Sequence, residues 1–555
     1  MAYKKEIIWI ISKINGYISR IMVLIFSLLI SAILSLLIPS INQKIIDDGF
    51  LISNFDNVLK YSKFMIIVII IQLGITLVKE VIRVNLNADI RYKLFYSAFS
   101  KLLINKLEFF EQNTSTEVLN SIRYDLDNIS RITQEEFFSP ITQVFNMIGA
   151  LIGLMFINVK LTLLIFLLVP IKYFVIKIFS KVRERLTQEC IQANEEFSKW
   201  FGDSINGIKE IKAFNIYNYK KNQFSEKEKK VIILNKKFSL LDACNIVFDS
   251  TFIQIIMVIV YIISTDYILN LDITIGGIFA FITYSPYVVQ PIYSILNIKY
   301  MLASIIPATK HFREFLDGDD ELNWGETQFN YNLSITGKIE FLNVNFSYAS
   351  KEVLSNINFT INSGEKVALI GSNGSGKSTI FNLILRFYEI NSGNILVDGI
   401  DINKIEINLY RNLISLINQD IYLFNDTLKE NITLHKDVDK ELLKLVIKKS
   451  GLDKFVEEVG LDYIINSNGS NLSGGQKQKI AIARALINDS QIILFDEAVS
   501  NLDVESSKEI YSLINTTLKD KTVIVISHDL DILKIVDKII SLKDGQVNVY
   551  RSNRV

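Results

Sequence analysis

The sequence predicts a chain of two parts, an all-α domain with six membrane-spanning helices and an α/β domain with a largely parallel sheet. The first observation behind this prediction is the concentration of apolar residues before about residue 305. The second is a change of pattern near Lys338, after which short β-rich runs alternate with helical ones. The third is composition. Among 555 residues 49% are hydrophobic and mean hydropathy is +0.28, yet 21% are charged, which favours a mixture of membrane and soluble parts.

The first predicted span covers residues 21–38, an apolar run without a charge. Its length is close to the roughly 20 residues that cross a bilayer. The run is too long for the core of a signal peptide, and no cleavage site of small residues follows it. Further spans are expected at residues 64–78, 137–157, 161–175, 246–264 and 275–296. Pro286 and Pro291 would interrupt the last span locally.

The segments 83–135 and 180–242 lie between spans and carry many basic residues. The positive-inside rule places them, together with both termini, in the cytosol. Apolar residues recur in them at helical spacing, so they are expected to continue the membrane helices by roughly 40 Å into the cytosol. A separate soluble helical domain is the alternative. We expect domains at 1–317 and 338–555, joined by an acidic, polar linker at 318–337.

The segment Gly371–Thr379 follows an apolar strand and opens a helical pattern, which is the setting of a phosphate-binding P-loop. Its backbone N–H groups and the helix N-terminus would bind phosphate oxygens. Lys377 would reach the β- and γ-phosphates, and the Ser378 hydroxyl would ligate Mg²⁺. The expected nucleotide contacts are Gly371, Ser372, Asn373, Gly374, Ser375, Gly376, Lys377, Ser378 and Thr379.

A second motif is the apolar run Ile492–Phe495, which ends in Asp496 and Glu497. Such a strand brings an aspartate beside the P-loop, so Asp496 is expected to help hold Mg²⁺. Glu497 would then polarise the water that attacks the γ-phosphate. An apolar run that ends in Asp-Glu is weak evidence alone, but it is strong evidence about 120 residues after a P-loop.

The third motif, Leu472–Gln476, reads LSGGQ and stands just before a helical pattern. N–H groups at a helix start form a phosphate site, so Leu472, Ser473, Gly474, Gly475 and Gln476 are expected to be a second nucleotide half-site. With this motif the whole chain resembles an ATP-binding cassette (ABC) exporter of the half-transporter kind. The resemblance implies an all-α six-helix transmembrane domain of the ABC exporter type plus an α/β P-loop NTPase (ABC ATPase) domain.

The resemblance also implies roles for single residues. Tyr348 matches the aromatic residue that stacks on adenine, and Gln419 matches the glutamine that senses Mg²⁺. His528 matches the histidine that contacts the γ-phosphate, and Asp503 ends the loop Ser500–Asp503 that crosses between paired cassettes. Catalytic roles are therefore expected for Glu497, His528 and Gln419, and Mg²⁺ contacts for Ser378, Gln419 and Asp496. The segment Gly207–Phe214 and residues 116–123 resemble the cytosolic coupling segments.

The sequence departs from the family pattern at Ser467, which stands where a glutamate is common before LSGGQ. This departure bears on how the cytosolic helices are gripped and not on ATP chemistry. Asn418 and Asn501 replace a common proline and a common alanine, and both are expected to be tolerated.

The function implied by the resemblance is that of an ATPase coupled to transport, with ATP and Mg²⁺ as ligands and a second copy or a second half-transporter as partner. The expected location is a cell membrane, and the abundance of Ile, Asn and Lys points to a bacterium. The expected cargo is a peptide or an amphipathic, lipid-like or drug-like compound that is exported. An importer of the siderophore type, a lipid flippase and a channel-like protein that only binds ATP are the alternatives.

Other features give little direction. Lys+Arg and Asp+Glu are both 59, so charge gives no sign of a nucleic-acid partner, and none is expected. The two cysteines have no metal-type spacing and form no disulfide framework. Several polar residues inside the spans could line a translocation path. Among them, Asp249 equally fits a position at the cytosolic interface.

Overall fold

The computed structural model describes residues 4–269, 273–321, 335–348, 351–497, 504–527 and 532–551. It divides into two compact units, which we describe separately. The first, helical unit comprises residues 1–100 and 116–318, and the second, ATPase unit comprises 101–115 and 319–555. The chain therefore passes between the units three times.

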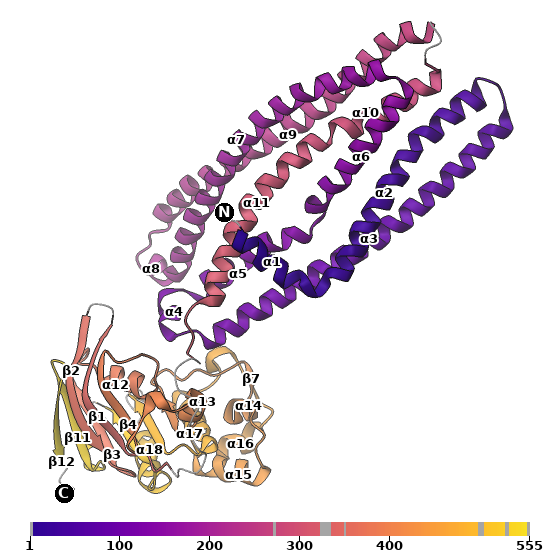
Figure 1. The fold of residues 1–555 in the computed structure, drawn as a ribbon. Helices are drawn as coiled ribbons and strands as arrows, with labels where there is room; N and C mark the ends of the chain where they lie inside the picture. The colour runs from indigo at the N-terminus through magenta and orange to yellow at the C-terminus, as the bar shows by residue number, and fades with distance from the viewer. Residues whose placement is uncertain are drawn as a thin grey trace. The chain divides into compact units, whose positions relative to one another are not determined.

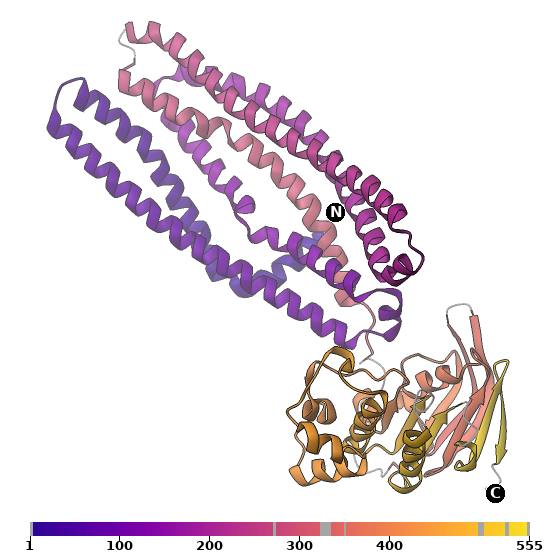
Figure 2. The same cartoon turned by 180° about the vertical axis from the view of Figure 1, so that it is seen from behind.

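Long helices make up the helical unit (Figures 1 and 2). Five stretches in the described residues are long and apolar enough to cross a membrane: Lys5–Phe50, Phe55–Ile104, Ser115–Ile157, Val159–Asn206 and Tyr217–Thr265. They contain five of the six predicted spans and confirm a helical transmembrane domain. The helices of this unit are α1 (Lys4–Ile14), α2 (Ile18–Lys44), α3 (Phe55–Ile104), α5 (Ser115–Ser130), α6 (Glu135–Ile157), α7 (Val159–Asn206), α8 (Ile208–Ala213), α9 (Tyr217–Leu269), α10 (Ile275–Val289) and α11 (Pro291–Asp317).

The sixth predicted span is broken into α10 and α11, as its prolines led us to expect. The break falls at Gln290, immediately before Pro291, which has no N–H to continue the helical hydrogen bonds. Pro286 remains inside α10. The shorter apolar helix α10 is mostly buried among its neighbours, with Ala280 and Phe281 fully covered.

The cytosolic segments are indeed continuations of the membrane helices, since α3, α7 and α9 have 50, 48 and 53 residues. Helices α7 and α9 run side by side along their lengths in both views (Figures 1 and 2). The six-residue helix α8 forms the turn between them and covers most of Gly207–Phe214. Residues 116–123 lie inside α5, and the short helix that precedes them is α4 (Leu107–Gln112).

Two sheets form the centre of the ATPase unit. The larger has the order β12-β11-β3-β10-β9-β6, with β11, β3, β10, β9 and β6 parallel, as the sequence predicted. The smaller, β2-β1-β4-β5, is antiparallel and was not predicted. The strands are β1 (Ile339–Tyr348), β2 (Lys351–Ile361), β3 (Lys366–Gly371), β4 (Ser392–Val397), β5 (Ile400–Asp401), β6 (Ile414–Ile417), β7 (Asp426–Thr427), β8 (Ile464–Ile465), β9 (Ile492–Asp496), β10 (Thr522–Ile526), β11 (Lys538–Lys543) and β12 (Gln546–Arg551).

Two apolar clusters cover the faces of the larger sheet. Successive strand residues point to opposite faces, so Val367 and Leu369 join one cluster and Ala368 joins the other. The first cluster includes residues of the smaller sheet and of α12, and the second includes α17 and α18. The helices of this unit are α4, α12 (Lys377–Ile384), α13 (Ile407–Asn412), α14 (Leu428–Thr433), α15 (Lys440–Lys449), α16 (Asp453–Val459), α17 (Gly474–Asn488) and α18 (Val504–Thr516).

Residues 101–115 and 319–321 are packed into the ATPase unit. Leu107 of α4 lies against the first apolar cluster. The Glu321 N–H donates to the Ile104 carbonyl at 2.8 Å, and the Glu321 carboxylate pairs with Arg411 of α13 at 2.7 Å. The end of α3 and the segment that follows α11 are thus fastened together before the chain continues.

Candidate nucleotide site

The parallel sheet brings the predicted catalytic segments to one edge. Leu369 of β3 is paired with Ile526 of β10, which in turn is paired with Asp496 of β9. Ile417 of β6 is paired with Phe495 of β9. Because parallel strands end at the same edge, the P-loop, Ser527, Glu497 and Gln419 all follow carboxyl ends of neighbouring strands.

The P-loop between β3 and α12 has the backbone that only glycine adopts easily. Gly374 and Gly376 have φ of +79° and +106°. A Cβ on Gly376 would lie 2.8 Å from Leu354 Cδ2, so a larger residue has no room there. The loop ends at the N-terminus of α12, where free N–H groups and the helix dipole favour an anion.

An open cavity of about 680 Å³ lies over this loop. Its lining contains eight of the residues that the sequence predicted: six from the P-loop, together with Tyr348 and Glu497. The lining residues are Tyr348, Val353, Asn373, Gly374, Gly376, Lys377, Ser378, Thr379 and Glu497. Val353 is the member that the sequence did not reveal, because a valine in a strand carries no chemical signal.

The polar atoms of the cavity fit a phosphate chain. Lys377 Nζ donates to the carbonyls of Gly371 and Ser372, at 2.8 and 3.1 Å, which points the ammonium along the loop. The Ser375 hydroxyl, which was expected to contact the nucleotide, is buried beneath the loop outside the cavity lining and has no partner among the described residues. A cation, hydroxyls and backbone N–H groups are the donors that phosphate oxygens accept from.

The acidic pair lies at the end of β9. Burial raises the pKa of Asp496, the neighbouring Glu497 raises it further, and Lys377 lowers it. Glu497 has φ of +47°, a conformation unusual for a residue with a side chain, and its N–H donates to the Ile526 carbonyl at 3.1 Å. The sheet thus fixes the glutamate in a strained backbone that directs it to the cavity.

Tyr348 is the aromatic residue in the lining of the cavity. Tyr348, at the end of β1, packs edge-on against Phe346 and Tyr388, with ring centroids 4.8 and 5.0 Å away. Asn382 Nδ2 donates to the Tyr348 hydroxyl at 3.3 Å. These contacts hold the ring in one orientation, with a face available for a flat base.

The LSGGQ segment forms the start of α17. Ser473 and Gln476 make a reciprocal capping box, with N···O distances of 2.8 and 3.2 Å. Among the described residues, none of Leu472–Gln476 lines the cavity over the P-loop, and neither does Gln419. The chain therefore carries the two half-sites apart within the ATPase unit.

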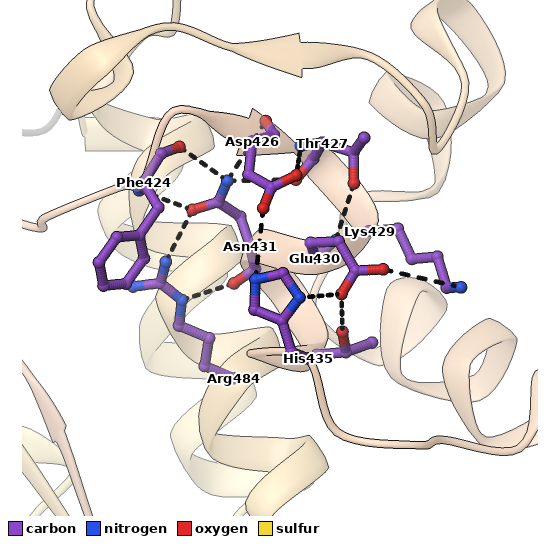
Figure 3. A network of polar contacts seen from close by, with 9 residues as sticks. Phe424, Asp426, Thr427, Lys429, Glu430, Asn431, His435 and Arg484 are labelled. Atoms are coloured by element: carbon purple, nitrogen blue, oxygen red, sulfur yellow. Dashed lines mark hydrogen bonds and ion pairs between the residues drawn. The ribbon is translucent and has the colours of Figure 1, made fainter. Parts of the chain in front are cut away.

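Further along α17, Arg484 fastens this helix to the segment that follows Gln419. Its guanidinium donates to the carbonyls of Asn431 and Tyr422, at 2.6 and 2.9 Å, and to Asn431 Oδ1 at 3.0 Å. Burial lowers the pKa of Arg484 to about 10. Figure 3 shows Arg484 below Asn431, and His435 between the carboxylates of Asp426 and Glu430. No pattern in the sequence predicted these contacts, through which Arg484 holds the LSGGQ helix.

His528 and Asp503 lie outside the described residues, together with the loop Ser500–Asp503. Their expected roles stay predictions.

Two family models match the chain. The model of the ABC transporter transmembrane region matches residues 21–292, and the ABC transporter model matches residues 354–500. The chain belongs to the ABC transporter family. It is a multi-pass membrane protein that couples ATP hydrolysis to transport, and its ATPase domain lies in the cytosol.

Curated relatives of this ABC transporter include three ATP-dependent lipid A-core flippases. That of Mannheimia succiniciproducens is 28% identical over 91% of this chain and 87% of the relative. Those of Thiobacillus denitrificans and Neisseria meningitidis serogroup B are 26% and 29% identical, over 94% and 82% of this chain and 91% and 74% of the relatives. A bacterial Atm1-family ABC exporter with ATP bound has the same fold, with a TM-score of 0.79, 22% identity, and coverage of 96% and 95%.

Proposed function

We propose that the protein is an exporter that moves an amphipathic, lipid-like substrate across the membrane, driven by ATP hydrolysis between two copies of its ATPase domain. The single observation that carries the catalytic part is the cavity that joins Lys377, Ser378 and Glu497. The flippase relatives support the lipid-like substrate.

In this proposal the P-loop residues bind the phosphates, and Tyr348 stacks on adenine. Ser378, Asp496 and Gln419 would hold Mg²⁺, for which carboxylate, hydroxyl and amide oxygens are suitable ligands. The ion, when bound, neutralises charge on the phosphates. Glu497 orients the attacking water, while His528 and Asp503 complete the site. The domain limits 1–317, 318–337 and 338–555 belong to the same proposal.

Two copies are needed because Leu472–Gln476 are absent from the cavity lining of their own chain. The capped start of α17 offers N–H groups to a second nucleotide, so the cassette of one copy would cover the ATP of the other. ATP then favours the paired state, because its γ-phosphate makes contacts that exist only there. Hydrolysis removes those contacts and resets the pair.

Differently tagged copies test this arrangement. A dimer with Lys377→Ala in one copy and Ser473→Arg in the other retains one intact site if sites form across the pair. A dimer with both changes in one copy, beside an unchanged partner, then has none. We expect about half of the normal ATPase rate in the first and background in the second, and the reverse result would show sites within single chains.

Reconstituted vesicles test the substrate. A fluorescent phospholipid and a fluorescent lipid A analogue are placed in the leaflet that faces the ATPase domain, and a fluorescent peptide is tested separately. We expect ATP-dependent movement of a lipid to the other leaflet, and none with Glu497→Gln. In a second set of vesicles the lipids are placed in the opposite leaflet, and their ATP-dependent movement toward the ATPase side would indicate an importer. Movement of the peptide alone would exclude a lipid-like substrate.

A further inference from the structure

A lysine is buried within the predicted membrane span of α7, in the helical unit. On α7, Ile165, Lys172 and Ile176 follow helical spacing along the inward face, and their exposures are 0%, 0% and 1%. Ile165 belongs to the apolar core of the unit, and Ile176 is buried as well. A charge in such a position is costly unless it is paired, and it marks a functional residue by default.

Two acceptors from two other helices surround the Lys172 ammonium. It forms an ion pair with the carboxylate of Asp249 on α9. It also donates to the backbone carbonyl of Val289 on α10, with an Nζ···O distance of 2.9 Å. Lys172 thus joins three helices. The sequence left open whether Asp249 lines a translocation path or lies at the cytosolic interface, and the structure shows it as the partner of this lysine.

Val289 is the last residue of α10, so the lysine reaches the point where the sixth span breaks. The last bond of α10 is made by the Gln290 N–H to the Pro286 carbonyl, at 2.9 Å. Pro291 has no N–H to offer to the carbonyls that precede it. A helix end inside a bilayer needs donors for its final carbonyls, and its partial negative charge favours a cation.

The α7–α9 hairpin below this point is held in register by polar pairs. Glu196 of α7 pairs with Lys230 of α9 at 2.8 Å, and Trp200 Nε1 donates to Gln223 at 3.2 Å. The hairpin ends at α8. A movement that begins at α8 can therefore pass up a registered pair of helices as far as Lys172.

We propose that Lys172 is a positioning residue of the transport cycle, which fixes the broken sixth span to the α7–α9 hairpin through Val289 and Asp249. The inner end of α10 then follows the hairpin when it moves. The cation serves as the cap of α10, and Asp249 connects the same cation to α9. The role of Lys172 in a transport cycle rests on the proposed function, but its contacts do not, and the test needs no substrate.

Four variants of the full-length protein separate the two contacts. Lys172→Met removes both. Asp249→Asn removes the ion pair and keeps the donor to Val289. The exchange Lys172→Asp with Asp249→Lys restores a pair, but a carboxylate at position 172 cannot donate to the Val289 carbonyl. Lys230→Met is the control, because it breaks a pair between the same two helices at a position nineteen residues before Asp249 on α9, or about 28 Å away at 1.5 Å per residue.

The measurement is amide hydrogen exchange of residues 284–296, in lipid nanodiscs without nucleotide and after trapping with ATP and vanadate. We expect at least tenfold faster exchange in Lys172→Met and in the exchanged pair, with Tm largely restored in the pair. Asp249→Asn and Lys230→Met should keep wild-type exchange in this segment. Basal ATPase activity should persist in all four variants. The change in exchange of residues 284–296 on trapping should be lost in Lys172→Met and in the exchanged pair.

Protection of residues 284–296 in the exchanged pair would overturn the proposal, since an ion pair alone would then suffice. Fast exchange in Asp249→Asn would overturn it as well, because the Val289 contact would be present and ineffective. If Lys172→Met does not fold, these two variants still decide. Glu497→Gln, which stops hydrolysis, should show wild-type exchange without nucleotide, so failure of the ATPase assignment is distinguished from failure of this one.

Discussion

The two units of the chain bury their apolar residues in opposite ways. In the ATPase unit every residue of β10 is buried, and both faces of the larger sheet are covered by the chain itself. In the helical unit only 6% of the apolar window of α3 is buried by the chain. The strands that carry the nucleotide site therefore rest on a core that one copy of the chain supplies. The exposed apolar face of α3 instead needs lipid or a second copy to cover it.

The same substitution, such as Ile→Ala, should therefore have different effects on stability in the two units. The size of the effect should depend on what covers the side chain and not on whether a helix or a strand carries it.

The largest expected effect is in the ATPase unit. Glu497→Gln keeps the shape of the side chain but removes the carboxylate that orients water, so we expect steady-state hydrolysis to fall by about 10² to 10⁴. ATP affinity should remain within a few-fold of wild type, because the P-loop contacts persist. A coupled ATPase assay and nucleotide binding measured side by side check this, and a normal rate would remove Glu497 from its assigned role.

The core of the same unit should be the next most sensitive. Ile524 of β10 is 1% exposed, and Ile524→Ala should lower the free energy of unfolding of this unit by about 2–5 kcal/mol through lost burial and a cavity. Urea unfolding monitored by hydrogen exchange of the ATPase peptides measures it. A loss below about 1 kcal/mol would show that the unit is not held by its own core.

An intermediate effect is expected at Asp398, whose carboxylate receives the N–H groups of Thr336, Gly337 and Lys338 at 2.6–3.0 Å. Asp398→Asn keeps the left-handed backbone, φ +50°, but places an amide against these donors. We expect a loss of about 1–3 kcal/mol at neutral pH. Thermal unfolding of the ATPase unit is the measurement, with Lys444→Ala, which breaks the exposed Glu441 pair, as the neutral control.

The pH dependence of that effect has a definite sign. Burial tends to raise the pKa of Asp398, but hydrogen bonds from Gly337, Thr336 and Lys338 outweigh it, so the folded pKa lies below 3.8. The stabilisation is complete well above pH 4 and is lost as pH falls through the folded pKa. The difference between wild type and Asp398→Asn should therefore shrink on acidification, and a difference that grew would contradict the assigned role.

The smallest effect is expected on α3. Ile70 is 62% exposed, and Ile70→Ala should change stability by less than about 0.5 kcal/mol, because the chain itself does not bury it. Thermal unfolding in nanodiscs at two protein concentrations tests this. A cost above about 1 kcal/mol that depends on concentration would show that a second copy covers this face.

The same contrast explains what the sequence could predict. The P-loop, Asp496 and Glu497, and LSGGQ are local, because neighbours in the chain supply their geometry, and prolines are local breakers, so the interrupted sixth span was predicted too. Pairings between distant residues were not. Lys172 and Asp249 are 77 positions apart, and Arg484 reaches back to Asn431 over 53. Nor did any pattern separate the antiparallel strands β1 and β2 from the parallel ones.

The short insertion of residues 101–115 into the ATPase unit has a consequence for cutting the chain. Leu107 packs against the first apolar cluster of that unit, and Lys106 pairs with Glu389 at 3.3 Å. Severing the backbone between residues 322 and 334, by a protease or by splitting the gene, would not remove this insertion. The two polypeptides would still share a folded body, and the motor would stay fastened to its membrane half without a covalent linker.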